Sequence, residues 1–428
     1  MTERRSSGVG VKRPGEFGRR ASTVVSGGEG ARRWGETLGF DDDGNVTSRS
    51  TTVGDPAAGG VAGSVLYAYD RAGRLTSETS GGSTVAFGWD GAGNRVSVTS
   101  PDGQQTGFSV DERNRTTGST DGVSYGWDQA GDRVSVTDPD GAVTATGYDA
   151  LGRPVEVDTN SGGVSTQVSY GWDGGGRLAT RNMTVDGNTV ADANLGYETP
   201  DSWDPVVVSD TLQVGTGPDG GQVSLGNSVT TTNFHGDLAA ATDTDGSVYT
   251  QSFDTFGQNT GPTQGMFGFQ SDLTEPVDGL VWMGARFYDP TTASFTSRDT
   301  YPGDVTDPIT LNRYLYANAN PTSNHDPDGH MGVKLTAEDR IRANIMEGPV
   351  QTQALAMYTA LGVARLFMLT DAGVVLAEAA IATRTPIVAS VPLITITIAT
   401  VTLFALSMTV LEWEGHTFRD TVTGACSS

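Results

Sequence analysis

The sequence predicts a mainly β protein, in which a repetitive sheet of antiparallel hairpins is followed by an α-helical, hydrophobic C-terminal region. Three observations support this prediction. An aromatic-Asp-x-x-Gly motif recurs through the first 260 residues, alternating apolar and polar runs lie between its copies, and the last hundred residues are largely apolar. Hydrophobic content of 36% and aromatic content of 8% are low for 428 residues, which favours an extended, repetitive architecture over compact globules.

The first 36 residues are expected to form a disordered basic leader. Residues 1–33 carry eight Arg or Lys against three Glu, are rich in Gly and Ser, and lack the apolar run of a signal peptide. Residues 34–331 have the opposite charge, with 13 Arg, no Lys and 40 acidic residues, a net charge of −27. Because such a field repels phosphates, we expect no nucleic acid to bind this region.

Residues 37–258 are predicted to be the repeat sheet. The copies read FDDDGN, YDRAGR, WDGAGN, WDQAGD, YDALGR, WDGGGR and FDTFGQ, starting at Phe40, Tyr69, Trp89, Trp127, Tyr148, Trp172 and Phe253, with a weaker VDERNR at Val110. A second kind of turn, such as SPDG or DPDG, lies between some copies, and runs such as RVSVT alternate over the length of a strand. Residues 182–232 match the repeat poorly.

The motif chemistry fits tight turns. Asp at the turn entrance can accept a hydrogen bond from the backbone two residues on, and Gly supplies the positive φ angle. In the weak copy, Asn114 stands at the Gly position, and Asn tolerates that conformation next best. The Asp residues also fit calcium ligands, but the turn role accounts for every one, so we expect no metal and no cofactor. A single cysteine, Cys426, excludes an internal disulfide and assigns no compartment.

Aromatic-Asp-x-x-Gly-Arg at a spacing near 20 residues resembles the YD repeats of the RHS family, which form a long sheet coiled into a hollow cocoon. Residues 259–330 are similar to the RHS repeat-associated core domain that closes such a cocoon, on the motifs GFQSDLTEPVDGLVWMGARFYDPTTASFTSRDT, LNRYLYANANP and HDPDG. The resemblance implies a partial RHS shell. Eight copies are few for closure, so an open, curved cocoon strip or an incomplete gene product is an alternative.

In many RHS proteins the core is a self-cleaving aspartyl protease, and matching its motifs position by position implies three catalytic residues: Arg286, Asp299 and Asp326. Two adjacent carboxylates can divide the roles of acid and base, and a guanidinium can hold one of them charged. The resemblance places the cut in the region of Gly329 and His330. From the residues alone, DPDG is an ordinary type I turn, so enzymatic activity stays open.

This core departs from the commonest family pattern in three places: ASF replaces GRF from Ala293, Thr300 replaces Pro, and His330 stands where Leu is frequent. None of these changes removes a proposed catalytic group, but they leave the cleaved bond open. The four histidines have no metal-ligand or nucleophile-base spacing, and His325 and His330 are expected to be solvated.

Residues 331–428 are predicted to be a variable helical tail. Thr336 and Asp339 fit a capping box, and the 24 residues of segment 387–410 carry no charge, enough for a helix of about 36 Å that could cross a bilayer core of about 30 Å. A helix buried inside a shell and a β-strand over ITITI are the alternatives. The tail has no phosphate loop, zinc-ligand pair or Cys/His constellation.

Together these features predict the C-terminal part of an RHS polymorphic toxin, whose shell carries a self-processed, membrane-active tail for competition between cells. Its expected partners are an immunity protein, a delivery apparatus and a target-cell membrane, and its expected location is secreted or at the cell surface. The alternatives are a non-enzymatic YD-repeat adhesion protein anchored by segment 387–410, or a carrier that lacks its toxin.

Overall fold

The computed structural model describes residues 20–25, 34–53, 61–197, 205–209, 212–216, 222–243, 248–261, 266–330 and 332–335. These all belong to the first of two compact units, Met1–Ile345 and Met346–Ser428. Within the described ranges, no helix is long and apolar enough to span a bilayer. The predicted leader for the most part, and the predicted helical tail beyond residue 335 with segment 387–410, lie outside them.

The repeat region is one antiparallel meander, in which each strand pairs with the next along the chain. Its strands are β1 (Arg20–Val25), β2 (Trp34–Phe40), β3 (Val46–Val53), β4 (Val61–Tyr69), β5 (Leu75–Ser80), β6 (Ser83–Trp89), β7 (Arg95–Thr99), β8 (Gln105–Val110), β9 (Thr116–Ser119), β10 (Ser124–Trp127), β11 (Arg133–Thr137), β12 (Val143–Tyr148), β13 (Pro154–Ser161), β14 (Val164–Trp172), β15 (Leu178–Val185), β16 (Asn188–Gly196), β17 (Val207–Val208), β18 (Leu212–Thr216), β19 (Gln222–Leu225), β20 (Ser228–Thr232), β21 (Leu238–Thr242) and β22 (Val248–Thr250). The mainly β prediction is confirmed, and the meander continues through residues 182–232, where the motif is weak.

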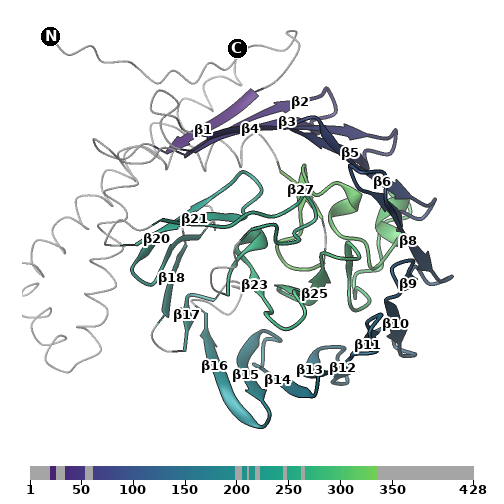
Figure 1. Cartoon of the computed structure of the whole chain (residues 1–428), viewed down its shortest axis with the longest axis vertical. Coiled ribbons are helices and arrows are strands. Elements are labelled where there is room, and N and C mark those ends of the chain that lie inside the picture. The colour runs from purple at the N-terminus through teal and green to yellow at the C-terminus, as the bar shows by residue number, and fades with distance from the viewer. Residues whose placement is uncertain are drawn as a thin grey trace, which may run out of the picture. The chain divides into compact units, whose positions relative to one another are not determined.

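A second part of the chain lies inside the curve of this meander (Figure 1). It consists of a small sheet, β23 (Leu273–Thr274), β24 (Val281–Met283), β25 (Arg286–Asp289) and β26 (Ser294–Phe295), the hairpin of β27 (Asn324–His325) and β28 (Val333–Lys334), and the 3₁₀ turns η2 (Phe269–Ser271), η3 (Pro308–Leu311) and η4 (Ala317–Ala319). We call residues 253–335 the inner segment.

The repeat turns have the geometry that the motif predicts. In the copy at Asp70, Oδ1 accepts the amides of Ala72 at 2.9 Å and Arg74 at 3.0 Å, and Gly73 has φ +78°. Asn114 adopts φ +64° at the Gly position of the weak copy. The motif's Arg has a role that sequence reasoning missed: Arg74 Nε donates to Oδ2 of the same Asp at 2.7 Å, which closes the turn.

The motif's aromatic residues join successive hairpins. Trp172 Nε1 donates to the carbonyl of Pro154 at 2.8 Å, one hairpin earlier, and the Arg153 guanidinium lies 5.4 Å from the Trp172 ring centre. The Trp and Tyr residues of the other copies make the same kind of bond to the previous hairpin. Neighbouring repeats therefore stabilise one another.

Aromatic and apolar residues on the concave side of the meander pack against the inner segment. Trp172 contacts Trp282 with ring centres 4.8 Å apart, and Trp127 contacts Tyr314 at 5.3 Å. A buried ion pair also crosses this boundary: Arg181 on β15 bonds both carboxylate oxygens of Glu275 at 2.7 to 2.9 Å. Both side chains are about 2% exposed or less. The core of the protein therefore lies between the sheet and the inner segment.

Repeat turns with Asn in place of Arg receive asparagines from the inner segment. Asn312 Nδ2 donates to Asn94 Oδ1 at 2.7 Å, and Asn320 Nδ2 donates to Asn45 Oδ1 at 3.1 Å. Each of these Asn side chains donates from Nδ2 to its own Asp, as Arg does, but its Oδ1 can also accept a bond from outside the turn, which Arg cannot. The LNRYLYANANP motif is thus one part of the inner segment that docks on the repeats.

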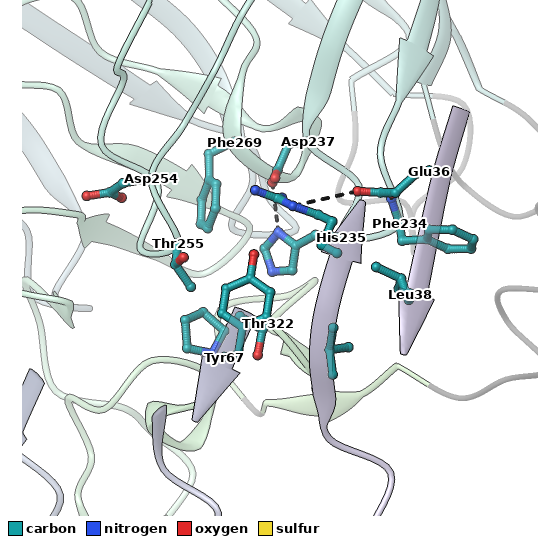
Figure 2. A pocket seen from close by; sticks show the side chains of 13 residues that line it. Glu36, Leu38, Tyr67, Phe234, His235, Asp237, Asp254, Thr255, Phe269 and Thr322 are labelled. Atoms are coloured by element: carbon teal, nitrogen blue, oxygen red, sulfur yellow. Dashed lines mark hydrogen bonds and ion pairs between the residues drawn. The ribbon is translucent and has the colours of Figure 1, made fainter. Parts of the chain in front are cut away.

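The first strands and the last hairpins meet around a small cavity of about 30 Å³ (Figure 2). Glu36 on β2 is 2% exposed and accepts the amide of Phe234, from the turn after β20, at 2.7 Å. Next to it, His235 Nδ1 lies 2.7 Å from Asp237 Oδ1. The bond of Glu36 to Phe234 joins β2 to the turn after β20.

Candidate active site

The three residues that the resemblance implies come together in the inner segment. Arg286 begins β25, Asp299 follows β26, and Asp326 follows β27. Their exposed fractions are 4%, 5% and 1%. Three separate loops and strands therefore place one guanidinium and two carboxylates in a single buried group.

Arg286 is the centre of this group. Its Nη2 lies 2.8 Å from Asp299 Oδ2 and 3.8 Å from Asp326 Oδ2. Its Nε donates to the carbonyl oxygen of Gly329, and its Nη1 donates to the carbonyl of Arg313 at 2.9 Å. Burial lowers the pKa of the guanidinium to about 10, against the opposing effect of the two aspartates, so the group stays protonated at neutral pH.

The Phe295 ring fixes the plane of this guanidinium. The Arg286 Cζ atom lies 3.6 Å from the centre of that ring, and Phe295 is fully buried. A stacked, planar fork aims several N–H groups in fixed directions, which a lysine could not do.

Residues 326–330 form a turn related to the repeat turns. The amide of His330 donates to Asp326 Oδ1 at 3.0 Å, as the fifth residue of each repeat turn does to its Asp. In four of the eight repeat turns that fifth residue is an Arg that pairs with its own Asp. Here it is His330, and the guanidinium beside Asp326 comes from Arg286 instead. The chain thus bends at DPDG, and the Asp326 carboxylate faces another strand.

Gly329 is pressed against the backbone of the neighbouring hairpin. Its φ is +72°, and a Cβ atom there would lie 2.0 Å from the carbonyl oxygen of Met283. The carbonyl of the preceding Asp328 accepts the amide of Ala285 at 3.0 Å. Only glycine fits this position, and the close approach brings the Gly329 carbonyl to Arg286.

His330 is not solvated as expected. Its Nδ1 lies 2.9 Å from Asp299 Oδ1, and its side chain is 32% exposed. His325, on β27, is also partly buried. The expectation of solvated histidines considered only the local turn, whereas Asp299 reaches His330 from a different loop.

An open cavity of about 200 Å³ adjoins this group, lined on one side by Arg286, Ser297 and His330 and on the other by Gly152 and Arg153 from a repeat turn. It is roomy enough for several water molecules and has polar walls. Water therefore has access to the Arg286 side of the buried group.

Gln270 is a residue of the site that no local pattern singled out. Its side-chain oxygen accepts the amide of Asp326 at 3.2 Å, and its nitrogen donates to the Tyr316 hydroxyl at 2.8 Å. It fixes the backbone at the start of the DPDG turn.

Two segments of the repeat region match a known family. Residues 69–106 and 127–165 match the family described as RHS Repeat. The meander therefore carries RHS repeats at these residues. Both matched segments lie in the meander, at copies whose turns and lateral contacts follow the motif.

Curated relatives of this chain are much longer than it is. It is 33% identical over 105 residues to the tRNA nuclease WapA of Bacillus subtilis (strain 168) and to the tRNA(Glu)-specific nuclease WapA of Bacillus subtilis subsp. natto (strain BEST195). Each alignment covers 23% of this chain and 4% of the relative. A crystal structure of TcdB2-TccC3 without its hypervariable C-terminal region matches 69% of this chain and 17% of that chain, at 17% identity and a TM-score of 0.45.

Proposed function

We propose that this RHS-repeat protein is the carrier part of a polymorphic toxin, and that its core cuts its own chain between Gly329 and His330. The contact of Arg286 with both carboxylates and with the Gly329 carbonyl carries this proposal. An ordinary turn needs no buried guanidinium on its backbone carbonyl, whereas amide hydrolysis needs a cation where negative charge develops.

The geometry divides the roles in the reaction. Asp299 is paired with Arg286, and we assign it the role of base, which takes a proton from a water molecule that enters from the open cavity. The water oxygen bonds to the Gly329 carbonyl carbon, and Arg286 stabilises the resulting oxyanion.

Asp326 lies on the other side of the same peptide bond. Its Oδ1 is 3.0 Å from the His330 nitrogen, so in its protonated form it gives a proton to that nitrogen as the C–N bond breaks. The products are a carboxylate at Gly329 and a new amino terminus at His330. Each Asp ends with its role exchanged. Asp299 then releases its proton and Asp326 takes one up, which restores the pair, and the new carboxyl group loses its proton to the new amine.

Substitution of each acid tests the reaction. Asp299→Asn and Asp326→Asn remove the base and the acid in turn, so each is expected to leave an uncut chain. Asp328→Asn is the matched control. The His330 amide donates to Asp328 Oδ1 at 3.0 Å, and the side-chain oxygen of Asn can accept the same bond. Arg286→Lys keeps the charge without the planar fork and is expected to slow the cut.

The measurement is a denaturing gel with intact mass. A cut after Gly329 gives a tail fragment of 99 residues, which is about 10 kDa on the scale of 44.6 kDa for the 428 residues of the chain. A wild-type chain that stays uncut under native conditions, or cutting that survives both Asn variants, contradicts the proposal. The adhesion alternative predicts an uncut chain, because a cut would separate the membrane anchor from the repeat sheet that it attaches to the cell.

The division into a repeat carrier (37–258), a core (259–330) and a variable tail (331–428), with the cut one residue before the end of the core, belongs to the same proposal. The nuclease names of the WapA relatives support a toxin context outside the producing cell, with an immunity protein and a delivery apparatus as partners. The uncharged segment 387–410 supports a tail that acts at a target membrane. An Arg placed at Thr397 is expected to disfavour insertion by about 2.5 to 3.5 kcal/mol, and unchanged binding to liposomes would contradict that part.

A further inference from the structure

His330 contacts both acids of the candidate active site. Its backbone amide donates to Asp326 Oδ1, and its imidazole Nδ1 is 2.9 Å from Asp299 Oδ1. It is also the residue whose nitrogen is the leaving group of the proposed cut. One residue of the substrate segment therefore reaches the acid through its main chain and the base through its side chain.

Among the residues that the structure describes, the other donors to the Asp299 carboxylate are a buried guanidinium and a backbone amide. Its Oδ2 is held by Arg286 at 2.8 Å, and its Oδ1 accepts the backbone amide of Tyr301 at 2.8 Å. Arg286 is buried and keeps its charge, and a backbone amide does not titrate. The imidazole is thus the contact of Asp299 whose charge changes near neutral pH.

Resting on the proposed self-cleavage, we propose that His330 is a positioning residue that makes the cut pH-dependent: its imidazolium restrains Asp299, and its loss of a proton frees Asp299 to act as the base. A carboxylate paired with two cations is a weaker base than one paired with Arg286 alone. A neutral imidazole can still donate from Nδ1, so the position of Asp299 is kept while its basicity rises.

The groups around His330 set where this change occurs. The hydrogen bond that His330 donates to Asp299 raises the pKa of His330 above 6.5, with a smaller contribution from Asp328, against the lowering effects of burial and of Arg286. Arg153, Arg298 and Asp132 line the same cavity. Cutting is therefore expected to accelerate above pH 6.5, on the order of tenfold across the transition.

Asp132 is the competing explanation for such a transition. Burial, and then the charge of Asp128, raise the pKa of Asp132 to about 6. It faces the cavity from a repeat turn rather than contacting either acid. Asp132→Asn is therefore the control variant, and it should leave the transition in place.

The test is the rate of cutting when the full-length chain refolds from denaturant at pH 5.5 to 9.5, followed by denaturing gel and intact mass. His330→Asn places an amide nitrogen close to the position of Nδ1, so it keeps a donor to Asp299 that does not titrate. Each rate is divided by that of His330→Asn at the same pH, which cancels the effect of pH on refolding. The wild-type ratio should rise with pH above 6.5, and the Asp132→Asn ratio should rise with it.

A flat wild-type ratio, or a rise that is lost in Asp132→Asn, overturns the role of His330 and leaves self-cleavage intact. A chain that is uncut at every pH overturns self-cleavage and this role together. The contact between His330 and Asp299 can also be measured without cutting. In the Asp326→Asn chain, which is expected to stay uncut, NMR should show that the His330 ring titrates above pH 6.5. Adding Asp299→Asn should lower that titration midpoint, and an unchanged midpoint contradicts the inference.

Discussion

Replacing Gly329 by Ala tests whether the backbone contact at the turn aligns the bond that is cut. A Cβ atom would lie 2.0 Å from the Met283 carbonyl oxygen, and 3.1 and 3.2 Å from the amides of Arg286 and Ala285. All three neighbours are backbone atoms of one hairpin, so the turn must move. Restoring ordinary contact requires a shift of more than about 1 Å.

Such a shift takes the Gly329 carbonyl away from the Arg286 guanidinium, and a misplacement of about 1 Å can reduce a rate about 100-fold. The positive φ angle adds a conformational cost of about 1–2 kcal/mol in stability. Gly279→Ala is the matched control, because Gly279 has φ +73° but nothing within 4 Å of its Cβ position. It should lose similar conformational stability and keep the cut.

The assay combines single-turnover cutting after refolding with a urea unfolding curve. We expect Gly329→Ala to cut at least about 100-fold more slowly than Gly279→Ala. Equal rates for the two variants would show that alignment at Met283 does not matter. A control variant that also stops cutting would show that positive φ angles in the inner segment, rather than this contact, are what matter.

Three further predictions follow from the contacts of the described residues. Glu275→Gln leaves the buried Arg181 charge unpaired and should destabilise folding by about 3–5 kcal/mol in urea unfolding, whereas adding Arg181→Met should restore much of that loss; strictly additive losses would contradict it. Leu335 is 8% exposed and its amide donates to the Ser323 carbonyl at 2.8 Å, which docks the start of the tail on the core. The two fragments should therefore co-elute in gel filtration after the cut, and Leu335→Asp should release the tail fragment. Wild-type fragments that separate would contradict this docking. Burial, and then the charge of Asp254, raise the pKa of Glu78 from 4.5 to about 7 in the folded chain. The free energy of unfolding should therefore fall by up to about 3 kcal/mol as pH rises from about 4.5 to 7. In Glu78→Gln this fall should be smaller, and an identical pH dependence of the two chains would refute the assignment.

The repeat turns could be predicted because their bonds are local. The Asp70 carboxylate, the amides that it accepts and the glycine that permits the turn all lie within five residues, so the motif itself carries the geometry. The pairing of Arg74 with the same Asp was equally local, and its fixed spacing from Asp was a signal that could have been used. Lateral contacts such as Trp172 on Pro154 depend on how hairpins stack, which the motif does not state.

The resemblance named the residues of the candidate active site, but the sequence did not predict the contacts between them. Arg286, Asp299 and Asp326 entered as a set through resemblance to the RHS core, and the residues alone indicated only a turn. The expectation that His330 is solvated was wrong because the surroundings of a side chain come from distant segments, here the loop that carries Asp299. Gln270 was missed for the same reason.

The sequence by itself determined the meander, its turns and its acidic charge, because alternation of side chains and the conformational needs of Asp, Asn and Gly act over a few residues. Tertiary structure decided which turns receive Asn312 and Asn320, which guanidinium lies against Asp326, and that a Gly329 carbonyl meets Arg286. Charges and hydrogen bonds over a few ångströms depend on where separate segments lie in space, and no spacing along the chain encodes that distance.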